Sequence, residues 1–287
     1  MAEPAPDLTL RGKTCLVTGA NRGIGRATAQ GLAGRGARVL LVSRDAAAGA
    51  EAAGAIRSAT GNQAVEALAA DLASQAAIRS LASEVLSRCP RLDVLINSAG
   101  LVTPKRTLTV DGIETVFAVN HLAYFLLTNL LLDRLKASAP SRIVNLASEA
   151  HQGQRLDFDN LQLERGWRPV KAYALAKLGN VMFTYELARR LAGTGVTANC
   201  LHPGVIATKL LLQYLPLPAI SQPLTRAFAG TPEQGAETPL YLATSPDVEG
   251  VTGTYFARCK PKRSTEFSYD EAAGRRLWDE SARLTGL

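Results

Sequence analysis

Short apolar segments alternate along this chain with longer segments of helical character, and no other feature limits the possible folds as strongly. The apolar segments lack the polar alternation of a half-exposed strand, so we expect strands buried on both faces. Alternating strands and helices predict a parallel sheet with right-handed crossovers. The predicted strands lie at residues 13–18, 38–42, 64–69, 92–97, 142–147, 196–201 and 253–256. The predicted helices lie near residues 24–34, 46–58, 74–88, 112–137 and 171–192.

This pattern predicts a single doubly wound α/β domain of the Rossmann type over residues 10–287, with a central parallel seven-stranded sheet and helices on both faces. We find no internal repeat or linker that would divide the chain, and residues 1–9 read as a flexible tail. Residues 204–230 interrupt the alternation with leucines and prolines. A long apolar loop inside a compact domain is usually functional, so we interpret it as a substrate lid.

Composition narrows the class of protein. The chain is 47% hydrophobic and 20% charged, which excludes wholesale disorder, collagen and a coiled coil. The net charge of +7 comes from scattered basic residues, so we expect no nucleic-acid partner. The basic segment at 258–263 is expected to be an ordinary exposed stretch. Four widely spaced cysteines without a ligand cluster favour a reduced protein that binds no metal.

The sequence also predicts a cytoplasmic protein without an integral membrane span. The longest apolar run, within residues 125–132, is far shorter than a bilayer requires. The first ten residues carry Glu3 and Asp7 and no basic region, which is unlike a secretory signal. A chain that keeps its cysteines reduced belongs in the same compartment.

A glycine-rich loop lies directly between the first predicted strand and the first predicted helix. Glycines at this point permit a tight turn, and the free N–H groups of the helix end can then face a pyrophosphate. The alternative is a glycine-rich turn that binds nothing. The candidate cofactor-binding residues of the loop are Gly19, Asn21, Arg22, Gly23, Ile24 and Gly25.

Four motifs in sequence order resemble the classical short-chain dehydrogenase/reductase family over about residues 10–257. The glycine loop has the spacing GxxxGxG. It is followed by Asn97-Ser-Ala-Gly100, Tyr173-Ala-Leu-Ala-Lys177 and Pro203-Gly204. The resemblance implies a nicotinamide-dependent oxidoreductase. It also implies that the cofactor is contacted by Asp71, Leu72, Asn97, Ala99, Gly100, Tyr173, Lys177, Pro203, Gly204, Val205, Ile206 and Thr208.

The long gap between Ser148 and Tyr173 resembles the retinol-dehydrogenase-like subgroup, as do Asn120-His-Leu and His202-Pro-Gly-Val. The whole chain resembles a soluble member of that subgroup, with a bacterial origin as one interpretation. There are departures: Ala147 replaces the first serine of the usual pair, and Ser98 replaces the second asparagine of the common NNAG. These departures concern retinoid specificity rather than the type of reaction.

Charge at the end of the second strand favours NADP(H) over NAD(H). In NAD-binding Rossmann sites this position is acidic, whereas here it is Ser43, followed by Arg44. With Arg22 in the glycine loop, two guanidinium groups suit a ribose 2′-phosphate. Asp45 is a counter-signal, because it could reach the ribose hydroxyl instead.

Tyr173 and Lys177 are one helical turn apart, so both side chains lie on one face of a helix. An ammonium group nearby favours the phenolate and lowers the pKa of the tyrosine, which could then transfer a proton at a carbonyl or alcohol oxygen. The resemblance implies that Ser148 hydrogen-bonds the reacting oxygen. It also implies that Lys177 binds the nicotinamide ribose and that Asn120 holds a proton-relay water.

The substrate-side candidates are mostly apolar. Leu101, Val102, Trp167 and Leu211 predict an apolar cleft and therefore a lipophilic aldehyde, ketone or alcohol. Glu149 either points to solvent or lines a pocket for a polar substrate. His151 is interpreted as a hydrogen-bonded structural residue.

The leading hypothesis is an NADP(H)-dependent enzyme that interconverts carbonyls and alcohols on a lipophilic substrate, with Tyr173 as the acid/base. One alternative is a ketoreductase that tailors natural products and takes a more polar or polycyclic substrate. Another is a redox sensor that binds NADP(H) without turnover. By analogy with the family, we expect a homodimer or homotetramer.

Overall fold

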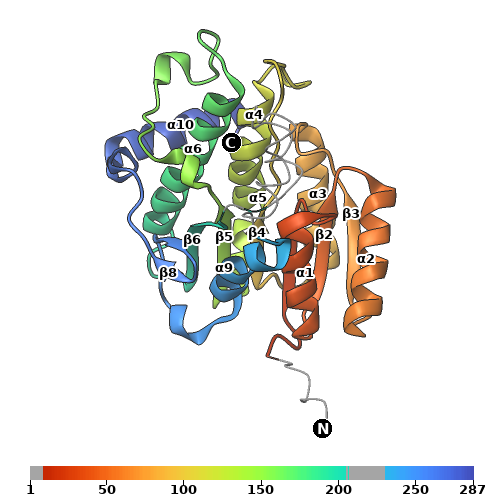
Figure 1. Ribbon diagram of the computed structural model, residues 1–287. Coiled ribbons are helices and arrows are strands. Elements are labelled where there is room, and N and C mark those ends of the chain that lie inside the picture. Colours follow the sequence, from red (N-terminus) through yellow and green to blue (C-terminus); the bar gives the residue numbers. More distant parts are fainter. Residues whose placement is uncertain (1–8, 205, 207–229) are drawn as a thin grey trace.

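Eight strands form one sheet in the computed structural model, which describes residues 9–204, 206 and 230–287. The order is β3-β2-β1-β4-β5-β6-β7-β8, and all pairs are parallel except β7 with β8 (Figure 1). The predicted α/β fold is confirmed. The strands are β1 Thr14–Thr18, β2 Arg38–Ser43, β3 Val65–Ala69, β4 Val94–Asn97, β5 Ser141–Leu146, β6 Val196–His202, β7 Tyr255–Ala257 and β8 Lys260–Pro261.

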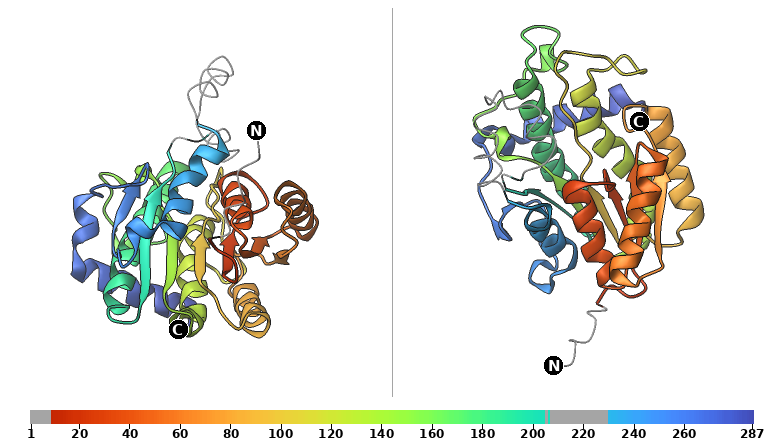
Figure 2. Two further views of the ribbon diagram at one scale, coloured as in Figure 1. Left: turned by 90° about the horizontal axis from the view of Figure 1, so that it is seen from below. Right: turned by 45° about the vertical axis from the view of Figure 1, so that its right-hand side comes forward.

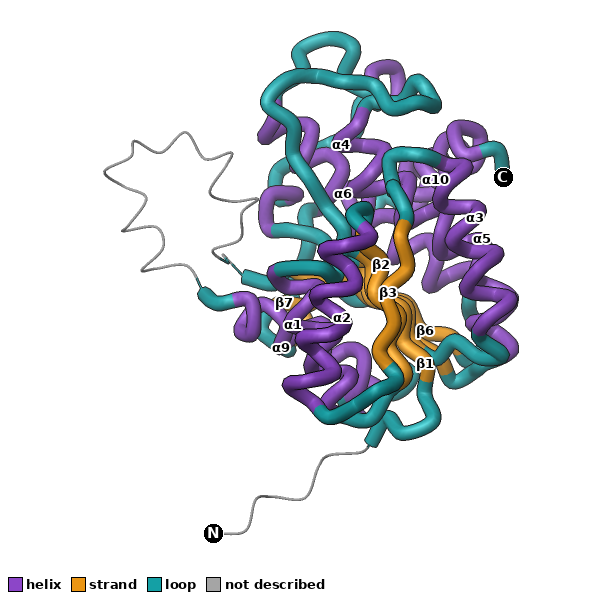
Figure 3. Tube along the Cα trace, turned by 90° about the vertical axis from the view of Figure 1, so that its right-hand side faces the viewer, coloured by secondary structure: helices purple, strands orange, loops and turns teal. Residues whose placement is uncertain are grey.

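Helices cover both faces of the sheet, as Figures 2 and 3 show. On one face α1 contacts α2 and α9, and on the other α3 contacts α5 while α6 contacts α10. The doubly wound arrangement was therefore predicted correctly. The helices are α1 Gly23–Gly34, α2 Ala46–Thr60, α3 Gln75–Arg88, α4 Thr115–Phe117, α5 Ala123–Ala137, α6 Pro169–Arg190, α9 Pro232–Thr244 and α10 Glu271–Thr285.

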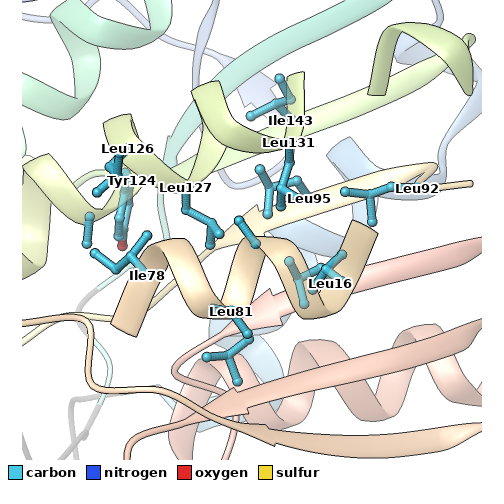
Figure 4. Packing of buried hydrophobic residues seen from close by; sticks show 14 of the residues in the cluster. Leu16, Ile78, Leu81, Leu92, Leu95, Tyr124, Leu126, Leu127, Leu131 and Ile143 are labelled. Atoms are coloured by element: carbon cyan, nitrogen blue, oxygen red, sulfur yellow. The ribbon is translucent and has the colours of Figure 1, made fainter. Parts of the chain in front are cut away.

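Strand residues alternate between two cores. In β1, Leu16 packs into the cluster under α3 and α5, while Cys15 and Val17 pack into the cluster under α1, α2 and α9. Figure 4 shows the first cluster, where Ile78 and Leu81 of α3 lie among leucines of α5 and the sheet. This is why the strands read as unbroken apolar runs: both faces of the sheet are buried.

Local signals set the ends of several helices. Asp45 accepts a hydrogen bond from Ala48 N at the start of α2, and Gly61 ends this helix with a φ of 70°. Helix α9 starts with a complete capping box between Thr231 and Gln234. Helices α9 and α10 were not predicted. The short β8 was missed too, so the predicted seven strands become eight, because a two-residue strand containing proline carries no periodic pattern.

The helix predicted near 112–137 differs from the observed one at its start. The Glu114 carboxylate accepts hydrogen bonds from Val116 N and Phe117 N, so the helix begins at Thr115. Residues 118–122 then form a π-helical turn before α5. Among the described residues, the stretch Thr115–Ala137 is long and apolar enough to cross a membrane, contrary to the expectation from uninterrupted runs. In the fold, 78% of its apolar window is buried, as in the core helix of a globular protein.

The sheet order reverses between β1 and β4, because the chain crosses from one half of the sheet to the other at this point. In open α/β sheets ligands bind outside the carboxyl ends of the strands at such a switch point. The connections after β4 and β5 lie at this end, at the top of Figure 1. This edge is therefore where the predicted site residues must meet.

A buried amide network fastens this edge to the helices below it. Asn97 Nδ2 of β4 donates to Asn145 Oδ1 of β5 at 2.8 Å and to Thr128 Oγ1 of α5 at 3.0 Å. Asn145 Nδ2 in turn donates to Thr184 Oγ1 of α6 at 3.0 Å. All four side chains are buried, so the hydrogen bonds cannot be replaced by water.

We expect Asn145→Ala to lower the free energy of unfolding by about 3 kcal/mol, because the buried side chains of Asn97 and Thr184 each lose a hydrogen-bond partner and a cavity is left between them. Urea denaturation measures this loss. The control is Asn129→Ala, whose amide is partly exposed and bonds only within α5; it should cost less than about 1 kcal/mol. Equal losses in the two variants would contradict the assigned role of the network.

Candidate active site

The glycine loop is pressed against the chain that follows β4. Gly19 has a φ of 66°, and a Cβ there would lie 2.7 Å from Ala99 Cα. A Cβ on Gly25 would lie 2.5 Å from Gly19 O. Both positions therefore require glycine.

The start of α1 has free N–H groups. No side chain caps this end, and no acidic residue lies in its first turn. An uncapped helix start behind a tight glycine turn is a binding site for an anionic phosphate. The residues present thus fit the pyrophosphate of a dinucleotide, with Asn21, Arg22 and Ile24 in the same loop.

The ends of β2 and β3 form the neighbouring part of the edge. Ser43 is buried, and its hydroxyl donates to Asp45 O at 2.9 Å. The Asp45 carboxylate, which could have opposed a phosphate here, is engaged as the cap of α2. Arg22 and Arg44 are exposed, and neither has an ion-pair partner within the described ranges.

The predicted pair Asp71 and Leu72 follows β3. Ala70 N donates to Ser43 O at 3.0 Å, so this segment continues along the end of β2. Asp71 Oδ1 accepts from Ala73 N at 3.0 Å, and Leu72 is buried. The pair thus lies on the same edge as Ser43.

The loop after β4 is held at both sides. Thr18 Oγ1 accepts hydrogen bonds from Ser98 N at 2.9 Å and from Ala99 N at 3.1 Å. The Tyr124 hydroxyl donates to Ala99 O at 2.7 Å. Sequence reasoning gave no role to Thr18 or Tyr124, although Thr18 directly precedes the glycine loop. Both fix the chain against which the glycine loop packs.

Four of the predicted residues come together next to this loop. A Cβ on Gly100 would lie 3.5 Å from Asn120 Oδ1 and 3.9 Å from Lys177 Nζ. Lys177 Nζ is 5.7 Å from the centre of the Tyr173 ring. The structure therefore gathers parts of the β4 loop, the π-helical turn and α6.

Asn120 is fixed by hydrogen bonds at its side chain and at its main chain. Its Oδ1 accepts from Leu101 N, and its Nδ2 donates to Leu101 O, both at 2.8 Å. Its main-chain oxygen accepts from Asn180 Nδ2 at 2.8 Å. The side chain that was expected to hold a relay water is thus bound to the backbone at 101, and Asn180 reaches the same turn from α6.

The main-chain oxygen of Leu146, at the end of β5, joins two of these groups. It accepts from Lys177 Nζ at 2.7 Å and from Asn180 Nδ2 at 3.2 Å. Sequence reasoning missed Asn180. Its spacing of three positions from Lys177, on the same face of α6, was the available signal.

Burial controls the acid–base properties of the site. Lys177 is only 4% exposed, and desolvation lowers the pKa of its ammonium to about 7. Desolvation raises the pKa of Tyr173, while a hydrogen bond with Ser148 lowers it in part. The expected lowering of the tyrosine pKa by Lys177 is therefore wrong for this geometry: burial raises the pKa of Tyr173, and the Lys177 ammonium donates to Leu146 O.

Ser148 begins the turn after β5. Its Oγ accepts from Ala150 N at 3.3 Å and so caps the 3₁₀ helix Glu149–His151. His151 Nδ1 lies 2.5 Å from Ser148 O, and its Nε2 accepts from Thr265 N at 3.3 Å. Burial lowers the pKa of His151, which matches a structural imidazole rather than a base.

The substrate-side residues are described only in part. Leu101 and Trp167 pack with Tyr173 against one apolar cluster, and Val102 is buried. Gly204 has a φ of 94°, and Pro203 precedes it. Ile206 contacts the position of Gly235 together with Ile24 of the glycine loop, which places it near the cofactor-binding loop. Val205, Thr208, Leu211 and most of the predicted lid at 204–230 lie outside the described residues.

Within the described ranges no group of three or more His, Cys, Asp or Glu side chains could hold a metal ion. The basic residues of the segment at 258–263 are exposed, as predicted, and Lys262 Nζ in addition donates to Glu149 Oε1 at 2.8 Å. This contact brings the predicted substrate residue Glu149 together with the end of the sheet.

Comparison with known proteins identifies the family. The family model described as short chain dehydrogenase matches residues 13–215. The chain belongs to the short-chain dehydrogenase/reductase family. It is accordingly an oxidoreductase of the carbonyl–alcohol type.

Several members of this family are similar over nearly the whole chain. Retinol dehydrogenase 14 of Mus musculus is 46% identical over 294 residues, which cover 97% of this chain and 87% of the relative. Retinol dehydrogenase 13 of Homo sapiens is 46% identical over 285 residues, covering 97% and 86%. The predicted resemblance to the retinol-dehydrogenase-like subgroup is thereby confirmed.

Solved structures of the family share the fold. An uncharacterised protein of Mycobacterium paratuberculosis has a TM-score of 0.79 and 33% identity, with 100% of this chain and 98% of that chain covered. The complex of RhlG with NADP from Pseudomonas aeruginosa has a TM-score of 0.71 and 31% identity, covering 88% and 97%.

We expect the stability conferred by Lys177 to depend on pH with a definite sign. Below about pH 7 the side chain is charged in both states, and burial of that charge destabilises the fold. Between about pH 7 and pH 10 only the unfolded chain keeps the proton, so rising pH stabilises the folded state. The melting temperature of the wild type relative to Lys177→Met should therefore rise over this interval.

The control for this measurement is Lys171→Met, an exposed lysine on the same helix. Its melting temperature relative to the wild type should stay constant over the same pH interval. A constant difference for Lys177→Met as well would contradict the pKa of about 7.

Proposed function

We propose that the protein is an NADP(H)-dependent oxidoreductase that interconverts an aldehyde or ketone and an alcohol on a lipophilic substrate. The observation that carries the proposal is the meeting of Tyr173, Ser148 and Lys177 at the switch-point edge, beside a glycine loop that fits a dinucleotide phosphate. In the reductive direction the cofactor supplies a hydride to the carbonyl carbon when bound.

The residues of the chain supply the proton. The raised pKa keeps Tyr173 protonated at neutral pH, so its hydroxyl can donate a proton to the carbonyl oxygen as the charge develops. Ser148 is the second donor to that oxygen and also holds the Tyr173 hydroxyl in place. The ammonium of Lys177 stabilises the phenolate that remains, because a positive charge in a buried site acts at low effective dielectric.

We propose that Tyr173 regains its proton by way of Lys177 and Asn120, which buried polar contacts hold in place. Lys177 and Asn180 meet on Leu146 O, and Asn180 also contacts Asn120 O. We propose that this chain orients Lys177 and Asn120 for exchange of the proton with solvent. In the oxidative direction Tyr173 first gives its proton to these groups and then, as the phenolate, accepts the proton of the alcohol.

Arg22 and Arg44 support NADP(H) as the cofactor. Both side chains are exposed, Arg44 directly follows the buried Ser43, and the carboxylate of Asp45 is engaged as the cap of α2. Two guanidinium groups without an ion-pair partner among the described residues favour a phosphate dianion on the ribose over a hydroxyl. The related RhlG structure contains NADP, which agrees with this choice.

The apolar lining and the relatives support a lipophilic substrate. Leu101 and Trp167 pack beside Tyr173, and the similar curated proteins are named retinol dehydrogenases. A polar substrate held by Glu149, as in the ketoreductase alternative, finds less support because Lys262 and Tyr255 already engage that carboxylate. A sensor without turnover remains the alternative that the experiment below tests.

We further propose that residues 10–287 act as one domain in the reducing cytoplasm. The sheet joins strands from both ends of the chain, and α1 packs on α9, which supports one folding unit. A homo-oligomer is proposed by analogy with the family.

We expect NADPH oxidation with a panel of lipophilic aldehydes and ketones, retinal included, and a loss of turnover of at least about 100-fold in Tyr173→Phe. Stopped-flow or steady-state absorbance of NADPH measures the turnover rate of the wild type and of the variant. Tyr241→Phe on α9 is the matched control and should keep the wild-type rate. Tight NADPH binding with no turnover of any compound would favour the sensor instead.

We expect the double variant Arg22→Ala/Arg44→Ala to lose at least about tenfold in kcat/KM for NADPH, because charge-assisted hydrogen bonds to the 2′-phosphate are lost. Its kcat/KM for NADH should stay unchanged, and Arg11→Ala should affect neither. A wild-type preference for NADH, or an equal loss with both cofactors, would contradict the assignment of the two arginines.

A further inference from the structure

The turn that carries Ser148 is held from one side by a distant part of the chain. We call residues 148–153 the serine turn and residues 255–265 the arm. The arm leaves the sheet through β7 and β8 and then leads to α10, in the blue part of Figure 1. Five hydrogen bonds join the two segments. Two of them reach the Glu149 carboxylate: the Tyr255 hydroxyl donates to Oε2 at 3.3 Å, and Lys262 Nζ donates to Oε1 at 2.8 Å. The other three run from Thr265 N to His151 Nε2 at 3.3 Å, from Gly153 N to Thr265 Oγ1 at 3.2 Å, and from Gln152 Nε2 to Arg263 O at 3.4 Å.

Glu149 is the centre of these contacts and directly follows Ser148. Each of its carboxylate oxygens accepts a hydrogen bond from the arm. Its main-chain N donates to His202 Nδ1 at 3.4 Å, and His202 Nε2 lies 3.8 Å from Glu149 Oε2. Burial raises the pKa of Glu149, but Lys262, His202 and Tyr255 together lower it more, so the carboxylate is ionised at neutral pH. The residue is thus tied at its backbone and at both oxygens.

The arm is a fixed frame for this ion pair. Between β7 and β8 the chain turns at Arg258 and Cys259, which have φ values of 51° and 59°. Two-residue hairpin turns with positive φ normally use Asn and Gly, so this turn holds two other side chains in an unfavourable conformation. Cys259 N donates to Thr238 Oγ1 at 3.2 Å, and Lys262 N donates to Tyr255 O at 2.8 Å.

We propose that Glu149 is a positioning residue for the reaction, and that its ion pair with Lys262 holds the serine turn so that the Ser148 hydroxyl stays within reach of Tyr173. The inference rests on the proposed function, in which Ser148 acts on the substrate oxygen. Without the ion pair, the serine turn keeps its internal hydrogen bond from Ala150 N to Ser148 Oγ. Because both partners belong to the turn, this bond does not hold the turn against the rest of the protein. The ion pair is thus the charged one among the contacts that fix the position of the turn, whereas the internal bond fixes only its shape.

The test compares Glu149→Gln and Lys262→Met with two reference variants. Lys262→Arg keeps a cation opposite Glu149. Arg263→Met removes the exposed pair with Glu266 from the same arm. We expect both breaking variants to lower kcat by about fivefold, the effect of losing a partly exposed ion pair, while KM for NADPH stays constant. Lys262→Arg and Arg263→Met should both keep the wild-type kcat.

The double variant Glu149→Gln/Lys262→Met should be no slower than either single variant, since both remove one interaction. Wild-type kcat in Glu149→Gln and Lys262→Met, or an equal loss in Arg263→Met, would overturn the inference. A purely structural role would lower the melting temperature without the selective change in kcat.

Amide hydrogen exchange in residues 148–153 gives a readout that does not need turnover. Exchange should quicken in Glu149→Gln and Lys262→Met and stay at the wild-type rate in Lys262→Arg and Arg263→Met. Unchanged exchange in the breaking variants would overturn the inference. If the wild type reduces no compound, the proposed function fails, and the exchange data still decide whether the ion pair holds the turn.

Discussion

The main-chain oxygen of Leu146 is the acceptor on which the site depends. It lies at the end of β5, where the sheet ladder ends and the carbonyl is free for other donors. Lys177 and Asn180 both donate to it, so one backbone atom sets the position of the ammonium and of the amide that reaches Asn120. The sheet itself, rather than a loop, therefore defines where the charge of the site is placed.

Burial of Lys177 and Tyr173 shifts the pKa values of both side chains, and the proposed proton transfer depends on these shifts. A lysine with a pKa of about 7 carries its charge only partly at neutral pH, whereas the desolvated Tyr173 keeps its proton. The pair is thus arranged as a proton donor beside a cation that gains most when the phenolate forms. The neighbouring amides of Asn97 and Asn145 find partners on other elements for three of their four polar atoms, and Asn97 Oδ1 has no hydrogen-bond partner among the described residues.

The sequence predicted the parts of the molecule that follow from a regular pattern of apolar residues or from steric limits on the backbone. Runs buried on both faces identified seven strands, and the glycines at positions 19 and 25 predicted the tight turn that the structure shows. It could not predict β8 or Asn180, because a two-residue strand has no period and an asparagine on a helix has no visible partner in one dimension. The pKa of Tyr173 was misjudged for a related reason: helical spacing shows that Lys177 is near, but only the fold shows how deeply both are buried.

The last part of the chain matters to both ends of the site, although its sequence carried little signal. Gly235 of α9 is the point where Ile24 of the glycine loop meets Ile206, so α9 supports the cofactor-binding side. The arm after β7 supports the opposite side, where Lys262 meets Glu149. The glycine loop follows β1 and the serine turn follows β5. Each is held in place by the later segment that packs on it. The short antiparallel strand β8 lies at the edge of the sheet and turns the chain back, so that Lys262 reaches Glu149, the residue after Ser148.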